Sequence, residues 1–100
     1  MDNQACLSLL GLAFRAGKCI VGEELILKEI RKGKIKLLLY ANDISNQTEK
    51  KLLNTCQTYN VVYMKVGDRE EISRAIGKQD RVAVAITDSG FAKKFKELLS

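Results

Sequence analysis

The sequence predicts a single α/β domain in which helices cover a β-sheet. Three apolar runs, at 36–41, 61–66 and 82–87, have the length and composition of buried strands, and stretches with helical spacing separate them. Alternation of strands and helices is typical of a sheet with helices packed on it. The chain has 100 residues, no proline and only seven glycines. We therefore expect one domain over residues 1–100 without a linker.

The N-terminal part predicts two helices with a short extended segment between them. Apolar side chains recur at helical spacing on one face of the first helix: Cys6, Leu9, Leu10, Ala13 and Phe14. Gly17 is expected to end this helix, and residues 18–21 then form a very short strand or an extended turn. A second helix is expected over 23–32, with Gly33 as its cap, because its acidic start and basic end match the helix dipole.

The rest of the chain predicts three more helices between the strands. Asn46 and Glu49 have capping-box spacing and predict a helix that begins there. Its expected core positions are Leu52, Leu53, Cys56 and Tyr59. Asp68 and Glu71 repeat the capping pattern before a short helix that Gly77 ends, and Asp88 is expected to cap the last helix. The core face of that helix is expected to hold Phe91, Ala92, Phe95, Leu98 and Leu99. The strand at 82–87 is apolar on both faces, as central strands are.

Most catalytic and metal chemistry is disfavoured by the composition. The chain has no histidine, which is the usual base for a serine or cysteine nucleophile. Its three cysteines lack zinc-ligand spacing and are expected to be reduced, mostly buried thiols. The neighbouring acids at 23–24 and 70–71 diverge by about 100° on a helix. We therefore expect no enzyme, no cofactor and no metal; an enzyme that uses a lysine or the Glu23–Glu24 pair stays open as a weaker alternative.

The sequence contains no signal for a membrane. No apolar run approaches the roughly 20 residues that span a bilayer. The start, Met1-Asp2-Asn3, lacks the basic residues of a signal peptide. We expect a cytoplasmic monomer without a membrane partner.

Positive charge is concentrated in one part of the chain. The net charge is +5, and residues 15–36 hold seven of the 17 lysines and arginines against three carboxylates. Lys28, Arg31 and Lys32 share a face of the second helix, and Lys18, Lys34 and Lys36 extend the excess around one end of the domain. This pattern favours nucleic acid over an anionic membrane as the partner. In the alternative interpretation these residues are a solvated surface with a Glu24–Lys28 ion pair.

A second candidate feature is the loop Gly77-Lys78-Gln79-Asp80-Arg81-Val82 before the last strand. Arg81 is suited to a phosphate or a guanine edge, and in the alternative it pairs with Asp80 or another acid. If Gly22 and Gly77 lie at the same end of the sheet, the loop and the start of the second helix form one cleft. Gly22 would then admit an RNA backbone. The six aromatic residues lie mostly at core spacing, which favours structured RNA over a single strand.

Two segments, LAFRAGKCIVGEELILKEIRKGKIKLLLYAND and AIGKQDRVAVAITD, resemble the kink-turn-binding ribosomal proteins of the L7Ae/L30e superfamily. Within that family the chain is similar to the small bacterial YlxQ-like branch, from Leu9 to Leu99. The resemblance implies a three-layer α/β/α sandwich with a mixed sheet of about four strands. It also implies non-catalytic RNA binding, typically at a kink-turn with tandem sheared G·A pairs.

The family's G-x-N-E-x-x-K pattern falls on the start of the second helix. Gly22 matches the glycine and Lys28 the lysine, whereas Glu24 replaces the asparagine and Leu25 replaces the glutamate. In the second loop Gly77, Lys78, Arg81 and Val82 resemble the L30e branch, and Asp80 stands where that branch can carry an aromatic residue. The expected RNA-binding residues are Lys18, Gly22, Glu23, Glu24, Lys28, Arg31, Lys32, Lys78, Arg81 and Val82.

The expected function is therefore the binding of structured RNA by a ribosome- or translation-associated protein. A kink-turn or a similar internal loop is the expected target, and ribosomal RNA or another structured RNA also fits. Ribosomes or translation factors are the expected protein partners. The alternative is a protein-interaction adaptor in translation or ribosome assembly with little affinity for RNA.

Overall fold

The structure, a computed structural model, describes residues 3–99, so Met1 and Asp2 of the N-terminal segment considered above lie outside the described residues. Five helices and four strands alternate in the predicted order. The helices are α1 (Asn3–Arg15), α2 (Glu23–Arg31), α3 (Asn46–Thr58), α4 (Arg69–Ile76) and α5 (Ser89–Leu99). The strands are β1 (Cys19–Val21), β2 (Leu37–Tyr40), β3 (Tyr63–Lys65) and β4 (Ala83–Ile86).

The strands form one mixed sheet in the order β1-β4-β2-β3. Central β4 runs antiparallel to both β1 and β2, whereas β2 and β3 are parallel. Every residue of β2 and β4 is buried. This confirms the prediction that the apolar run at 82–87, which contains β4, forms a central strand. The segment after α1 is a strand rather than a turn because its backbone pairs with β4 over three residues.

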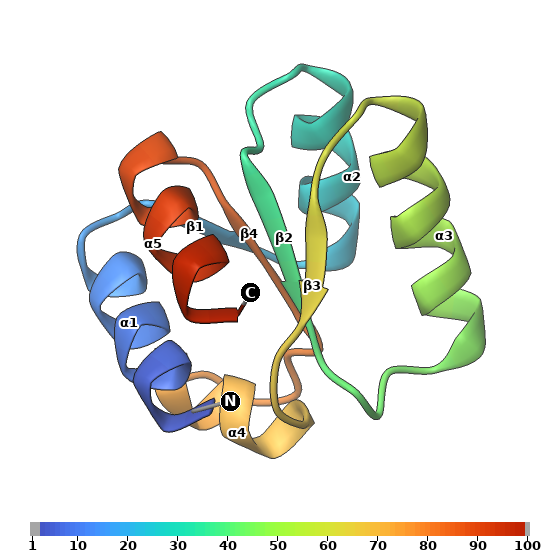
Figure 1. The fold of residues 1–100 in the computed structure, drawn as a ribbon. Helices are drawn as coiled ribbons and strands as arrows, with labels where there is room; N and C mark the ends of the chain where they lie inside the picture. Colours follow the sequence, from blue (N-terminus) through green and yellow to red (C-terminus); the bar gives the residue numbers. More distant parts are fainter. Residues whose placement is uncertain (1–2, 100) are drawn as a thin grey trace.

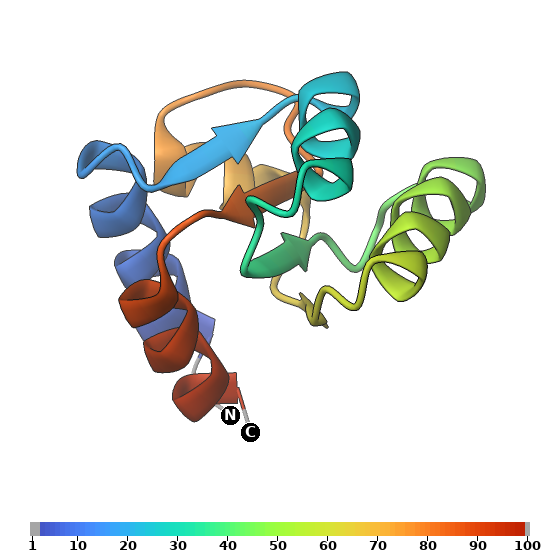
Figure 2. The same cartoon turned by 90° about the horizontal axis from the view of Figure 1, so that it is seen from above.

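Helices cover both faces of the sheet and give three layers (Figures 1 and 2). Helices α1, α4 and α5 pack on one face, in a core that includes Leu10, Ile72 and Phe95. Helices α2 and α3 pack on the other face, in a core that includes Ile26 and Leu52. Strand residues divide between the two cores by alternation: Leu37 and Leu39 face the first, Leu38 and Tyr40 the second.

The helix boundaries follow local capping chemistry. Asp68 and Glu71 form the predicted capping box, and Asp88 Oδ2 accepts a hydrogen bond from the Phe91 amide at 2.9 Å. The prediction that Asn46 caps α3 was wrong by one residue, because Ser45 Oγ accepts from the Thr48 amide at 3.3 Å. Serine and asparagine are near-equivalent N-cap residues, so the sequence alone does not decide whether Ser45 or Asn46 caps the helix.

Two residues expected in the core lie at the surface. Tyr59 is 45% exposed and Leu98 is 39% exposed. Tyr59 follows the last residue of α3, and Val61 fills the core position instead. On α5 the buried residues are Ala92, Phe95 and Leu99, which complete a stripe without Leu98.

All three cysteines are free thiols in the described part of the chain. Burial raises the pKa of Cys6 and Cys56 from 9.0 to about 11 and that of Cys19 to about 12. In the unfolded chain the thiols ionise near pH 9, whereas in the folded domain they stay protonated. Their contribution to stability is therefore complete below pH 9 and is lost as the pH rises toward 11 for Cys6 and Cys56 and toward 12 for Cys19.

We expect the free energy of unfolding to fall across that range in urea titrations. A variant with Cys6→Ala, Cys19→Ala and Cys56→Ala is the control, since its stability should depend less on pH. An equal fall in unfolding free energy with pH for both proteins would contradict this interpretation.

A search of the helices within residues 3–99 finds none with the length and apolar composition of a membrane span.

Candidate nucleic-acid interface

The strand directions bring two distant segments to one end of the sheet. Strand β1 ends where β4 begins, because the two strands are antiparallel and Val21 pairs with Val84. Gly22 therefore follows β1 beside the 77–82 loop that leads into β4. Strand β2 also ends here, with Tyr40 opposite Ala83, so the loop that leads to α3 joins them. We call this the cleft end; it lies at the bottom of the sheet in Figure 1.

A cavity of about 170 Å³ opens between these segments. Its lining comes from the start of α2, the first turns of α3 and the start of β4: Gly22, Glu23, Thr48, Leu52, Asp80, Arg81, Val82 and Ala83. Gly22 has φ 97° and ψ 122°, a backbone conformation that residues other than glycine rarely adopt. The predicted proximity of Gly22 and the second loop is therefore present in the fold.

The backbone of Arg81 is fixed by a buried serine. The Arg81 amide donates to Ser73 Oγ at 2.9 Å, and Ser73 Oγ donates to the Arg81 carbonyl at 3.3 Å. Ser73 lies on α4 and is only 7% exposed. These two bonds tie the loop to α4 and hold Arg81 at the cavity.

The side chain of Arg81 has a buried donor without a partner. Its Nε has no hydrogen-bond acceptor among the described residues. Asp80, the suggested ion-pair partner, instead lies 3.3 Å from Arg69 Nη1. A buried donor left unpaired costs about 1–3 kcal/mol, so such a group at a cavity is suited to a ligand that supplies an acceptor.

The carboxylates at the start of α2 share one lysine from α3. Lys51 Nζ lies 3.2 Å from Glu23 Oε2 and 3.9 Å from Glu24 Oε1. The side chain of Glu24 remains 92% exposed. Lys51 offsets part of the negative charge that would repel a phosphate. Sequence reasoning missed Lys51 because no local pattern links it to α2.

Lys28 lies on the helix whose first residues line the cavity. It is six residues beyond Gly22, a rise of about 9 Å along the helix. Lys28 is exposed, and the suggested Glu24–Lys28 ion pair is absent from the described part of the chain. Leu25, where the family pattern has glutamate, is 46% exposed beside these residues.

Lys78 points to a different layer from Arg81. Its Nζ lies 5.8 Å from the centroid of the Phe14 ring, at the end of α1. Lys78 therefore contributes a cation–π contact rather than a wall of the cavity. The loop supplies Asp80, Arg81 and Val82 to the cavity but not Lys78.

Lys18, Arg31 and Lys32 do not gather at the cavity. Lys18 precedes β1, and its carbonyl accepts from the Thr87 amide at 3.0 Å, beyond the far end of β4. Arg31 and Lys32 end α2 at that same far end, beside the segment that leads to β2. The expectation of a single basic corner is thus replaced by two groups of cations at opposite ends of the sheet.

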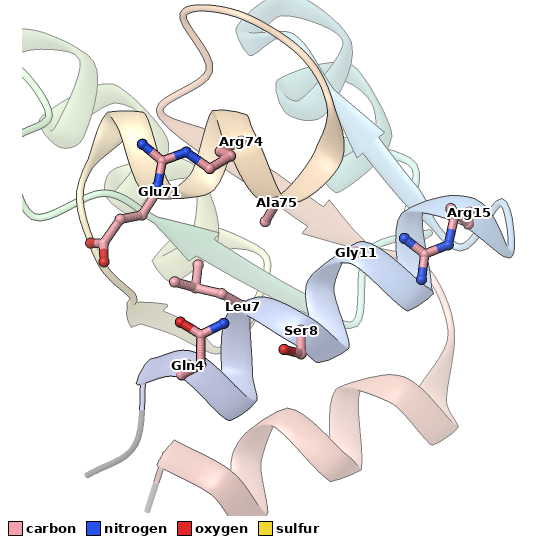
Figure 3. Close-up of a pocket in the computed structure, with 8 residues that line it drawn as sticks. All are labelled: Gln4, Leu7, Ser8, Gly11, Arg15, Glu71, Arg74 and Ala75. Carbon is pink, nitrogen blue, oxygen red and sulfur yellow. The ribbon is translucent and has the colours of Figure 1, made fainter.

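A larger hollow of about 360 Å³ lies between α1 and α4 (Figure 3). Arg15 borders it at the end of α1, and Arg74 and Glu71 border it on α4. Arg74 pairs with Glu70, and Glu71 accepts from the Asp68 amide. The lining of the hollow is mostly polar, but the two α4 residues with charged side chains, Glu71 and Arg74, already have partners on α4 or at its N-cap.

Replacing Ser73 by alanine should loosen the loop that carries Arg81. The change leaves the buried Arg81 amide without an acceptor, so we expect a loss of about 1–2 kcal/mol in unfolding free energy. Urea denaturation measures this loss. Ser73→Thr keeps the hydroxyl and is the control. If Ser73→Ala were as stable as the native chain, the hydroxyl would not anchor the loop.

Comparison with known proteins finds one matching family and similar chains in other organisms. Residues 4–96 match the family described as "Ribosomal protein L7Ae/L30e/S12e/Gadd45 family". The chain is 48% identical to "RNA-binding protein YlxQ" of Bacillus subtilis over 99% of both chains. A solved structure from Bacillus halodurans, described as a protein with unknown function, has a TM-score of 0.89 and 41% identity over 93% of this chain and 94% of that one.

A more distant structure shares the fold. The "15.5kD RNA binding protein" of Giardia lamblia has a TM-score of 0.79 over 94% of this chain and 83% of that one. The identity is only 19%, so this likeness concerns the fold alone.

Proposed function

This chain belongs to the ribosomal protein L7Ae/L30e/S12e/Gadd45 family, and from that premise we propose that it binds structured RNA at the cleft end without catalysing a reaction. The YlxQ protein of Bacillus subtilis, which is named as RNA-binding, aligns with the chain over nearly its full length. The proposed target is a kink-turn or a similar internal loop, in ribosomal or other ribosome-associated RNA. The proposed location is the cytoplasm.

The Nε of Arg81, which has no acceptor among residues 3–99, carries this proposal. A phosphate oxygen or a guanine edge supplies the acceptor that this donor lacks, and an arginine fork binds either group through two parallel bonds. The cavity is too small for a nucleotide to enter whole, at about 170 Å³, but it admits one phosphate or one base edge. An RNA backbone or internal loop that lies across the cleft fits this shape.

Gly22 and the acids of α2 would complete the contact. Without a Cβ at Gly22, an RNA backbone can approach the free amides at the start of α2. The exposed carboxylate of Glu24 is positioned to accept from guanine N1–H or N2–H, while Lys51 and Lys28 offset its charge toward phosphates. Val82 adds an apolar wall on the side of β4.

A second candidate function is a protein-interaction adaptor. The exposed Leu25 favours it, because an apolar side chain stands beside the cleft where the family pattern has a charged residue. Such an adaptor would bind its partner through apolar area, and its affinity would depend little on salt.

A salt titration separates the two functions. We expect a kink-turn RNA with tandem sheared G·A pairs to bind in gel-shift assays and to lose affinity linearly on a log–log plot against salt. The matched control is the same RNA with the G·A pairs replaced by Watson–Crick pairs. Absence of binding to both RNAs at low salt would reject RNA binding and leave the adaptor.

A further inference from the structure

The end of the sheet opposite the cleft carries a dense group of cations. The five residues are Lys18, Arg31, Lys32, Lys34 and Lys36, and all five are exposed. We call this group the lysine end. It comprises the loop between α2 and β2, at the top of Figure 1, and the segment between α1 and β1, at the left of that view.

Backbone pairing brings the two outer lysines of this group together. The Thr87 amide donates to the Lys18 carbonyl at 3.0 Å, and the Lys36 amide donates to the Ile86 carbonyl at 2.8 Å. Lys18 and Lys36 therefore flank the end of β4 on its two sides, about 10 Å apart across two strand spacings. The next residues, Cys19 and Leu37, pack in the core with α1 and α5.

Strand alternation then directs Lys18 and Lys36 toward the layer of α2. The last turn of α2 ends on that layer with Arg31 and Lys32. Gly33 takes φ 74° and reverses the chain, and Lys34 follows at once. One turn, one helix end and two strand ends thus converge in space.

Carboxylates do not balance this charge. Within the described part of the chain, the five cations make one ion pair, between Lys32 Nζ and Glu29 Oε2 at 3.6 Å. The C-terminal dipole of α2 accounts for one or two cations in its last turn, but not for Lys18 or Lys36. The other four cations have no ion pair among the described residues, and exposed cations in this number form a surface for polyanions.

Lys28 lies between the two ends of the domain. It lies on the exposed face of α2 between the cleft and the lysine end, and Arg31 follows it one turn later. The first turn of α2 is acidic, and cations occupy its second half from Lys28 to Arg31. A polyanion of regular shape that leaves the cleft along this helix meets positive charge from Lys28 onward.

We propose that the lysine end is a second RNA contact, which binds the phosphate backbone of the helical stem that continues from the RNA held in the cleft. This inference rests on the proposed function. The protein would then contact the RNA at two places. The second contact would not depend on the RNA sequence, because phosphates carry no base information.

The test compares two kink-turn RNAs and two protein variants of equal charge. One RNA has a short stem, and the other has the same stem extended by a full helical turn. The first variant carries Lys18→Gln, Lys34→Gln and Lys36→Gln. The control carries Lys93→Gln, Lys94→Gln and Lys96→Gln on α5, which packs on the opposite face of the sheet.

We expect the native chain to bind the long RNA more tightly than the short one. The lysine-end variant should lose that gain, by about tenfold at low salt, and its log–log salt slope on the long RNA should fall by about 2–3. Its affinity for the short RNA should stay unchanged, and the α5 control should behave as the native chain. Thermal melting checks that both variants are folded.

The outcomes separate this inference from the proposed function. Equal losses for the two variants on the long RNA, or no gain from the longer stem, would overturn the second contact while cleft binding stands. If the native chain bound neither RNA, the proposed function would fail, and the second contact with it.

Discussion

Replacing Arg81 by alanine is expected to weaken RNA binding by about 10–100-fold, the range of one arginine contact to a base edge or phosphate. The change removes the buried Nε, which has no acceptor among the described residues. The hydrogen bonds between the residue 81 backbone and Ser73 can stay. We therefore expect the unfolding free energy to change by less than about 1 kcal/mol. Gel shifts with the short kink-turn RNA measure the affinity, and urea titration measures the stability.

The matched control for this prediction is Lys93→Ala. It also removes one positive charge, from an exposed position on α5. Both variants lower the net charge equally, so a loss seen only for Arg81→Ala reports a local contact. Equal affinities of the two variants would mean that Arg81 does not touch the RNA.

Replacing Gly22 by alanine is expected to damage both folding and binding. A Cβ at φ 97° strains the backbone, at a cost of about 1–3 kcal/mol. Within the described structure the new Cβ meets nothing within 4 Å, so the protein itself has room for it. The methyl group instead occupies the space through which an RNA backbone would approach, and we expect at least about tenfold weaker binding.

Gly33→Ala separates strain from blockage. Gly33 also has a positive φ, 74°, and space for a Cβ, but it lies at the other end of α2. Both alanine variants should be less stable in urea titrations. Only Gly22→Ala should bind the short kink-turn RNA more weakly. A similar loss for Gly33→Ala would show that the effect comes from destabilisation rather than from the cleft.

The fold was largely predictable from local patterns. The helical spacing around Leu10, the capping box at Asp68 and the apolar run of β4 each correspond to an element of the structure. The errors fall at the ends of helices. Ser45 and Asn46 compete for one cap, and Tyr59 lies one position beyond the helix that would have buried it.

The candidate site was only partly predictable, because its parts meet through strand pairing. The sequence pointed to Gly22 and Arg81 as separate features, and the antiparallel pairing of β1 with β4 brings them to one end. The same pairing sends Lys18 to the other end. A run of charges in the sequence indicates charge density, but the sheet decides on which side of the molecule each cation lies.

The most direct test of the central claim is to observe the Arg81 Nε–H by NMR as a structured RNA is added. In the free protein this donor has no partner among the described residues, so its signal should move strongly when an RNA oxygen or nitrogen accepts from it. Amide signals of Gly22 and Val82 should shift at the same RNA concentrations. Saturable RNA binding that leaves the signals of Arg81, Gly22 and Val82 unmoved would contradict the cleft as the binding site.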